Sequence, residues 1–432
     1  MAKDTNLKLR SQNIYQVFLR QHTKEGTFLS LIADLARIKS LGMDYLYLLP
    51  IHPIGEKNRK GSIGSPYSIK DFRATNPDYG TIEDFEKLVK EAHNHGLKVM
   101  IDIVFNHTSH DSVLIKEHPE WYKYKEGKLT TRVPEWWDIV DLDFSNKDLW
   151  EYLIETLEFW TTKGIDGFRC DVAPLIPMEF WLEARKRVQK INPNIVFLSE
   201  SVHLSFVKLL RDSGYYAASD SETYKAFDIL YDYDIHQEYL DYIEKKDSLN
   251  NWLESIIRQE SLYPANYIKL RNLENHDQPR IASFITNPNK LLNMTALLGY
   301  LKGTMMIYAG QEYGVSNRPD LFELDQIDLT PNNMEIRDLI HRLGHLRKDQ
   351  LFQTGVFNIH LQDVEVAVLS YENETSIAFG IFNVGNKKGE IKIPLPDGIY
   401  QNILYPNQVE VKDNRVKLSQ KPIIIFSMKI KL

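Results

Sequence analysis

The fold of this chain is decided by residues 81–107, which read TIEDFEKLVKEAHNHGLKVMIDIVFNH. Thr81 and Asp84 have the spacing of a capping box that begins a helix, and Gly96 has the position of a residue that ends one. Between them, apolar side chains recur on one helical face, at Ile82, Phe85, Leu88, Val89 and Ala92. The apolar run Lys98–Phe105 follows at once and predicts a buried strand. The stretch therefore predicts one helix-then-strand unit of an α/β fold.

The same alternation of short apolar runs and helical patterns extends from about residue 14 to residue 347. The runs that predict strands are Ile14–Phe18, Tyr45–Leu49, Lys98–Phe105, Gly167–Cys170, Ile195–Leu198, Phe227–Leu230, Tyr267–Leu270 and Thr304–Tyr308. Strands that alternate with helices pair in parallel, and eight such units close into a (β/α)₈ or TIM barrel. An open, doubly wound parallel sheet is the competing interpretation. The pattern predicts the α/β class and favours the barrel.

Two regions depart from this alternation. About 40 residues separate the third strand from the helical pattern that begins near residue 147, which is too long for a simple loop. After residue 347, short strands such as Val364–Tyr371 and Ile377–Asn383 predict an all-β domain. The predicted domains are the barrel at 1–107 and 147–349, an inserted subdomain at 108–146, and a C-terminal β-sandwich domain at 350–432.

The composition is that of an ordinary globular protein. Over 432 residues, 43% hydrophobic and 26% charged side chains allow a large core. The formal net charge of −7 argues against nucleic acid as the main partner. The single cysteine, Cys170, excludes an internal disulfide. The polar start has no signal-peptide core and no apolar run approaches the length of a membrane span, so we expect a cytoplasmic protein without membrane contact. The composition indicates no oligomeric state.

Three carboxylates follow short apolar runs, and each has a polar or charged neighbour. They are Asp171, Glu200 and Asp277. In a parallel barrel the carboxyl ends of the strands meet at one face, where active sites lie. The residues at or just past such ends are Asp102, His107, Arg169, Asp171, Glu200, His276 and Asp277. Converging carboxylates are what cleavage of a sugar acetal requires, because one attacks, one donates a proton and one steadies the developing positive charge.

The neighbours of two carboxylates suggest their roles. Strand alternation puts Arg169 and Asp171 on the inward face and Cys170 on the outward face. Arg169 is expected to keep Asp171 ionised through its charge and hydrogen bonds, as a nucleophile requires. Glu200 follows the apolar run 195–198, so partial burial and nearby anions should raise its pKa, as a proton donor near neutral pH requires.

Four motifs, in order along the chain, resemble the signature regions of the alpha-amylase superfamily, glycoside hydrolase family 13. They are DIVFNH at 102–107, GFRCD at 167–171, Glu200, and NHD at 275–277. The segment SPYS at 65–68 is similar to the family's stretch that carries an aromatic platform. The resemblance covers residues from about 10 to 350, and a C-terminal β domain is typical of the family too.

The resemblance implies a role for each residue that matches a motif position. It implies Asp171 as nucleophile, Glu200 as general acid/base and Asp277 as transition-state stabiliser. Arg169 would orient Asp171, and Asp102 would be structural. The residues that would bind the attacked sugar are His107 and His276, through its hydroxyls, and Tyr67, by stacking on its ring. The implied mechanism is double displacement with retention of the α configuration.

The resemblance also raises the question of a structural calcium ion. Asn106 matches a calcium-ligand position of the family, but calcium needs six or more oxygen ligands. Asp138, Asp141 and Asp143 are available in the insertion, and equally could be solvated loop acids. In many relatives a Lys and a His follow the nucleophile, but this chain has VAPL at 172–175. The lysine contact and the usual backbone link between calcium and the active site are therefore expected to be absent. The chemistry itself requires no cofactor.

The motifs predict an enzyme that acts on an α-glucan oligosaccharide or polysaccharide. A barrel that has lost its activity is the alternative, but such relatives usually lack a carboxylate, whereas this chain keeps all three. The first prediction is a hydrolase of α-1,4-glucosidic bonds in maltodextrins or glycogen fragments. The alternatives are an α-glucanotransferase and an exo-acting α-glucosidase or sucrose- or trehalose-cleaving relative. The short insertion favours an open cleft and internal cleavage.

Overall fold

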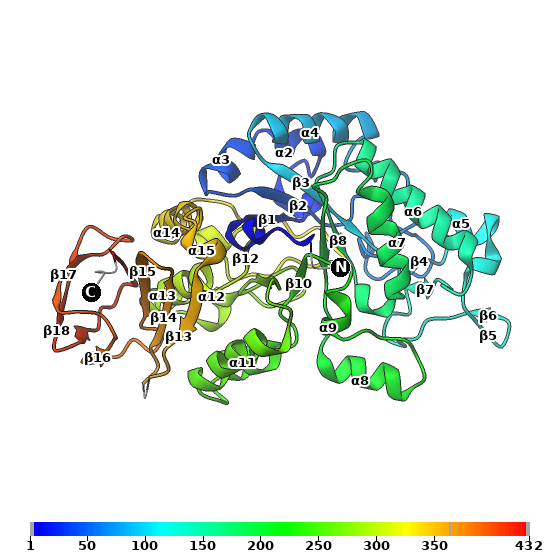
Figure 1. Cartoon of the computed structure of the whole chain (residues 1–432). Helices are drawn as coiled ribbons and strands as arrows, with labels where there is room; N and C mark the ends of the chain where they lie inside the picture. The colour runs from blue at the N-terminus through cyan, green and yellow to red at the C-terminus, as the bar shows by residue number, and fades with distance from the viewer. Residues whose placement is uncertain (1–3, 363, 429–432) are drawn as a thin grey trace.

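The computed structural model describes residues 4–362 and 364–428, and eight parallel strands form a closed barrel at its centre (Figure 1). The barrel strands are β1 (Asn13–Val17), β2 (Tyr45–Leu48), β3 (Lys98–Ile103), β8 (Gly167–Cys170), β9 (Val196–Ser199), β10 (Ile229–Tyr231), β11 (Lys269–Arg271) and β12 (Thr304–Tyr308). Ile14 of β1 pairs with Tyr45 of β2 on one side and with Met306 of β12 on the other, which closes the cylinder. The predicted barrel is confirmed, and the open sheet is excluded.

Helices connect the strands and surround the barrel (Figure 1). The longer ones are α3 (Leu35–Ser40), α4 (Ile82–Asn94), α6 (Lys147–Thr162), α7 (Met178–Val188), α8 (Leu204–Asp212), α10 (His236–Ile243), α11 (Leu249–Leu262), α13 (Pro288–Tyr300) and α14 (Met334–Leu346). Shorter ones are α1 (Leu19–His22), α2 (Phe28–Ile32), α5 (Val113–Glu117), α9 (Asp220–Thr223), α12 (Ile281–Phe284) and α15 (Leu351–Thr354). Single 3-10 turns are η2 (Leu7–Ser11), η3 (Pro119–Trp121), η4 (Ala173–Leu175) and η5 (Gln311–Tyr313).

The unit at 81–107 folds as its sequence predicts. Thr81 caps α4 by accepting from the Asp84 backbone, and the Asp84 side chain accepts from the Thr81 backbone in return. The apolar face of α4 is buried, and Gly96 follows the helix with a φ of 70°, which glycine adopts without strain. Burial in β3 begins at Val99, directly after the exposed Lys98. Local capping and periodicity therefore suffice to specify this helix and strand.

The insertion between β3 and α6 contains short antiparallel strands. In it, β4 (His107–Ser109) pairs with β7 (Ile139–Asp141), and β5 (Tyr124–Lys125) pairs with β6 (Lys128–Leu129). Because β4 begins directly after β3, the insertion grows from the carboxyl end of a barrel strand. It is therefore placed beside the mouth of the barrel (Figure 1).

The C-terminal region forms two antiparallel sheets of four strands each. One contains β13 (Val356–Ile359), β14 (Ala367–Glu372), β15 (Ser376–Phe382) and β20 (Ile423–Met428); the other contains β16 (Glu390–Lys392), β19 (Arg415–Lys417), β18 (Gln408–Lys412) and β17 (Gly398–Gln401). The first sheet packs on the barrel, where the ring of Tyr300 in α13 lies 5.4 Å from the rings of Tyr371 and Phe382. The predicted all-β end is confirmed, and the domain boundaries at 107/108, 146/147 and 349/350 stay predictions.

The core has an inner and an outer layer. Ile14, Met100 and Leu198 point into the barrel, whereas Val17 and Leu46 pack against the helices. Strands buried on both faces explain why their sequences are continuous apolar runs. Within the described ranges, no helix has the length and apolar character needed to cross a membrane.

Candidate active site

The register of the barrel brings the predicted site residues to one end. Asp102 of β3 pairs with Arg169 of β8. The backbone N–H of Asp171 donates to a carbonyl of β3 (2.9 Å), and that of Glu200 donates to a carbonyl of β8 (3.0 Å). The strand pairing thus continues one residue past each strand. Asp171 and Glu200 therefore lie on neighbouring strands at the carboxyl end of the barrel, where barrel enzymes bind substrate.

Arg169 is the centre of this site. Its side chain is fully buried, and its Nη1 lies 2.9 Å from Asp102 Oδ1 and 2.8 Å from Asp171 Oδ1. Its Nη2 lies 2.9 Å from Glu200 Oε1. A guanidinium is planar and rigid, so it fixes the carboxylates that it binds relative to one another. One cation therefore holds both predicted catalytic carboxyl groups.

Burial governs how these two carboxyl groups titrate. Burial raises the pKa of Asp171 to about 7, although the charge of Arg169 opposes it. Arg169 therefore acts in the predicted direction, toward an ionised Asp171, through its charge and its hydrogen bond, but burial has the larger effect on the pKa of Asp171. Burial also raises the pKa of Glu200, to about 8, and the charges of Asp171 and Asp277 add to the effect. Burial therefore brings the pKa of both carboxyl groups from the ordinary acidic range toward neutral pH.

The third carboxylate lies next to a pair of stacked rings. The rings of Tyr67 and His276 are 5.4 Å apart and nearly parallel, at 13°. The Tyr67 hydroxyl donates to Asp102 Oδ2 (2.9 Å) and lies 2.6 Å from His276 Nε2. That same Nε2 lies 2.9 Å from Asp277 Oδ2. Burial alone would raise the pKa of Asp277, but His276 and nearby arginine charges outweigh it and lower the pKa.

Two residues that hydrogen-bond to site residues were not identified from the sequence. Gln16 of β1 lies with its Nε2 3.0 Å from His276 Nδ1, and Tyr47 of β2 donates to Asp102 Oδ2 (2.7 Å). Each fixes a site residue that belongs to a distant part of the chain. Their one sequence signal is a polar or aromatic side chain within a predicted barrel strand.

A cavity of about 290 Å³ opens above these groups. Its lining residues come from the segments that follow β2, β3, β8, β9, β11 and β12: Lys60, Ser65, Tyr67, His107, Trp136, Asp138, Ile139, Asp171, Val172, Glu200, Asp277, Leu321 and Phe322. Lys60 bridges two of the loops, because its Nζ lies 2.8 Å from Asp138 Oδ1 in the insertion and 6.0 Å from the Phe322 ring centre. The sequence did not point to Lys60, Leu321 or Phe322. The volume of this cavity is near the lower end of the range for small-molecule sites.

Family models match both parts of this architecture. The model described as "Alpha amylase, catalytic domain" matches residues 12–139 and 135–350. The model described as "Bacterial Alpha amylase C-terminal domain" matches residues 356–425. The chain belongs to the alpha-amylase family. The resemblance drawn from the motifs is thereby confirmed.

Solved structures of alpha-amylases resemble this family member over its whole length. An alpha-amylase from Lactobacillus plantarum is 39% identical, with a TM-score of 0.95 over 98% of this chain and 100% of that chain. A maltogenic alpha-amylase from Thermotoga neapolitana is 34% identical, with a TM-score of 0.88 over 98% and 100% of the two chains.

A curated relative carries a different name. An alpha-1,4-glucan:maltose-1-phosphate maltosyltransferase from Myxococcus xanthus is 30% identical over 379 residues, which are 79% of this chain and 53% of that protein. This family member therefore spans about half the length of that relative.

The calcium-ligand position of the family is in contact with an arginine. Asn106 Oδ1 accepts from Arg132 Nη2, and Asp141 Oδ2 accepts from Arg132 Nε at 2.7 Å. Asp138 pairs with Lys60, and Asp143 accepts from a backbone N–H within its own turn. The acids of the insertion therefore do not converge on one point.

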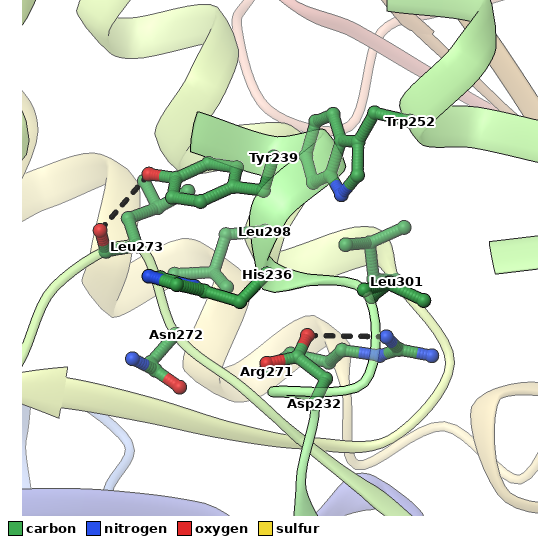
Figure 2. Close-up of a pocket in the computed structure, with 10 residues that line it drawn as sticks. Asp232, His236, Tyr239, Trp252, Arg271, Asn272, Leu273, Leu298 and Leu301 are labelled. Atoms are coloured by element: carbon green, nitrogen blue, oxygen red, sulfur yellow. Dashed lines mark hydrogen bonds and ion pairs between the residues drawn. The ribbon is translucent and has the colours of Figure 1, made fainter. Parts of the chain in front are cut away.

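A second cavity lies beside α10 and α11 and shares no lining residue with the first (Figure 2). Its volume is about 10 Å³, which suits one water molecule and excludes a sugar. Asp232 pairs with Arg271 at 3.2 Å, and the Tyr239 hydroxyl donates to the Leu273 carbonyl at 2.9 Å. The first contact joins the segment after β10 to β11, and the second joins α10 to the segment after β11.

Proposed function

We propose that this protein cleaves α-1,4-glucosidic bonds of maltodextrins and related α-glucans with retention of configuration. The observation that carries the proposal is the guanidinium shared by Asp171 and Glu200. Retaining enzymes have carboxyl groups about 5–5.5 Å apart, whereas inverting enzymes need about 6.5–9.5 Å to admit a water. Two carboxylates bound to the terminal nitrogens of one guanidinium support the shorter separation.

In the first step, protonated Glu200 donates its proton to the glycosidic oxygen while a carboxylate oxygen of Asp171 attacks the anomeric carbon. The glycosidic C–O bond breaks, and a glycosyl ester forms on Asp171. Asp277, whose pKa lies below its usual value, stays ionised and offsets the positive charge that develops at the anomeric carbon.

In the second step, Glu200 acts as a base. Its carboxylate removes a proton from the incoming hydroxyl, which attacks the anomeric carbon and releases Asp171. Two successive inversions give net retention. The backbone N–H of Val172 donates to Glu200 Oε2 (2.9 Å), which would keep the carboxyl group oriented through both steps.

The groups around the carboxylates suit a glucosyl ring. Tyr67 lines the cavity, and sugar rings stack on aromatic side chains. His107 lines the cavity, and burial lowers its pKa to about 4, so its imidazole is neutral near pH 7 and can bond a sugar hydroxyl. His276 contacts Asp277 and would bind the same ring.

The incoming hydroxyl belongs either to water or to a second sugar. The Lactobacillus plantarum structure, which matches over 98% of this chain and 100% of that chain, is of an alpha-amylase and supports hydrolysis. The curated Myxococcus xanthus relative is a maltosyltransferase, which supports the α-glucanotransferase alternative more directly than hydrolysis. Both acceptors use the same glycosyl ester on Asp171. A cytoplasmic location also stays a prediction.

Product analysis tests the proposal. The protein is incubated with maltoheptaose, pullulan or sucrose, and the products are separated by chromatography, with Asp171→Asn as the inactive control. Products shorter than maltoheptaose, released in the α configuration by NMR, are expected. Products longer than the donor would identify transfer, and glucose alone would identify exo cleavage. Release of the β anomer, or no turnover of any α-glucan, would contradict the proposal.

A further inference from the structure

The Arg132 side chain donates hydrogen bonds to three oxygen atoms that belong to separate segments. Its Nε donates to Asp141 Oδ2 of β7 (2.7 Å), and its Nη1 donates to the carbonyl of Leu175 (3.3 Å). Its Nη2 donates to Asn106 Oδ1, in the segment between β3 and β4. The Arg132 side chain is 7% exposed and that of Asp141 is 1% exposed. One buried guanidinium therefore joins the insertion to two barrel loops.

These partners are an amide oxygen, a carboxylate and a backbone carbonyl. That set of hard oxygen ligands is what calcium prefers. Asn106 is also the residue that matches a calcium-ligand position of the alpha-amylase family. In this protein the Arg132 guanidinium donates a hydrogen bond to each of the three oxygens. The same oxygens therefore do not also fit a calcium ion. In the described part of the chain, no group of three or more His, Cys, Asp or Glu side chains is arranged to hold a metal ion.

We propose that Arg132 takes the place of a structural calcium ion and that the protein folds and works without calcium. A guanidinium suits this role because it stays charged at any relevant pH and directs several N–H groups in fixed directions. Unlike a metal ion, it is covalently attached and cannot be removed by a chelator. The inference concerns the insertion and holds whatever sugar the enzyme uses.

The contacts of Arg132 continue to the active site. The backbone N–H of Leu175 donates to the Val172 carbonyl (2.9 Å), and Val172 in turn donates to Glu200. On the other side, Asn106 Nδ2 lies 3.1 Å from His107 Nδ1. The absence of the usual backbone link between calcium and the active site stays a prediction; in this protein the Leu175 carbonyl accepts from Arg132. Arg132 is thus a positioning residue.

The first experiment uses the wild-type protein. It is treated with EDTA, dialysed and titrated with calcium chloride, and calcium binding is measured by calorimetry and thermal unfolding. We expect no binding heat, and the same Tm and rate before chelation, after it and with calcium restored. Stoichiometric calcium binding, or a Tm that falls on chelation and recovers with calcium, would overturn the proposal.

The second experiment compares Arg132→Ala with Arg185→Ala. Arg185 is also buried and paired, with Asp228 at 2.6 Å, but it does not join the insertion to the barrel. Both variants should lose roughly 5 °C or more in Tm, because each leaves a buried carboxylate unpaired. Arg132→Ala alone should lose on the order of tenfold in kcat. Of the two variants, only Arg132→Ala should gain Tm and kcat when calcium is added. The reason is that it leaves Asp141 exposed to the added ion, and Asp141 Oδ1 has no hydrogen-bond partner among the described residues.

Two results from the variants would contradict the inference. One is an Arg132→Ala protein with the wild-type Tm and rate, since Arg132 would then hold nothing in place. The other is an Arg132→Ala protein that is destabilised yet has no response to calcium, since the three oxygens would then not be a cation site. The unfolding measurements of the wild-type protein and of the variants use no substrate, so their outcomes do not depend on the substrate proposed above.

Discussion

A change of pH across the neutral range is the most direct perturbation of the catalytic pair. Asp171 must be ionised to attack, and burial raises its pKa to about 7, so kcat/KM should fall as the pH drops through that value. Glu200 must be protonated to act as the acid, and burial raises its pKa to about 8, so kcat/KM should fall as the pH rises through that value. Beyond each limb, every further pH unit costs about tenfold. The expected profile is a narrow bell between the two values.

The assay is kcat/KM for maltoheptaose, measured from about pH 5 to about pH 10 so that both limbs are covered. Asp102→Asn supplies a second test, because the charge of Asp102 raises the pKa of Asp171. Its removal should shift the acid limb by about one unit to lower pH. The control is Asp212→Asn, a surface substitution in α8 that should leave both limbs in place.

Two outcomes would refute the reasoning. A rate that does not depend on pH, with chemistry rate-limiting, would show that Asp171 and Glu200 do not act as nucleophile and acid. An acid limb near 4, the ordinary value for an aspartate, would show that burial does not control the ionisation of Asp171.

Four further substitutions have definite expected outcomes. Asp171→Asn and Glu200→Gln should each lower kcat by on the order of 10³-fold or more, because each removes a group that acts in the transition state. Circular dichroism should show that both variants stay folded, and a smaller loss of kcat in kinetic assays would contradict the assigned roles. Lys60→Ala removes the bridge to Asp138, so the size distribution of products from maltoheptaose should change, whereas Lys70→Ala, which alters an exposed pair with Glu56, should not change it. Val172→Gly keeps the backbone N–H that donates to Glu200 and relieves a φ of 35°, but it gives the backbone more freedom, so Glu200 is held less firmly; kcat should fall by up to about tenfold while the free energy of unfolding changes by about 1 kcal/mol or less.

The barrel was predictable because its signals are local. Capping at Thr81, the apolar face of α4 and the run that becomes β3 all lie within one short stretch. Strand ends were less accurate: the apolar run to Phe105 predicted a longer strand than β3, which ends at Ile103. Phe105 is buried although its backbone has left the ladder, so hydrophobicity reports burial and does not report where strand pairing stops.

Only the site residues that belong to one of the family motifs could be predicted from the sequence. Gln16 and Lys60 contact site residues through side chains that are far apart in sequence, and no periodic pattern marks such contacts. Arg132 lies in a segment without regular structure, and its three partners come from segments before and after it in the sequence. Such contacts exist only once the barrel has closed.

The amino-acid sequence by itself determined the chemistry available to this protein: an α/β barrel, three carboxylates at the ends of its strands, and the motifs of the alpha-amylase family. Tertiary structure decided how those groups behave. Burial outweighs Arg169 in the pKa of Asp171, and a guanidinium lies among the oxygens where the motif suggested calcium. The reason is that desolvation and cation binding each depend on every group that surrounds a site, and those groups are brought together only by folding.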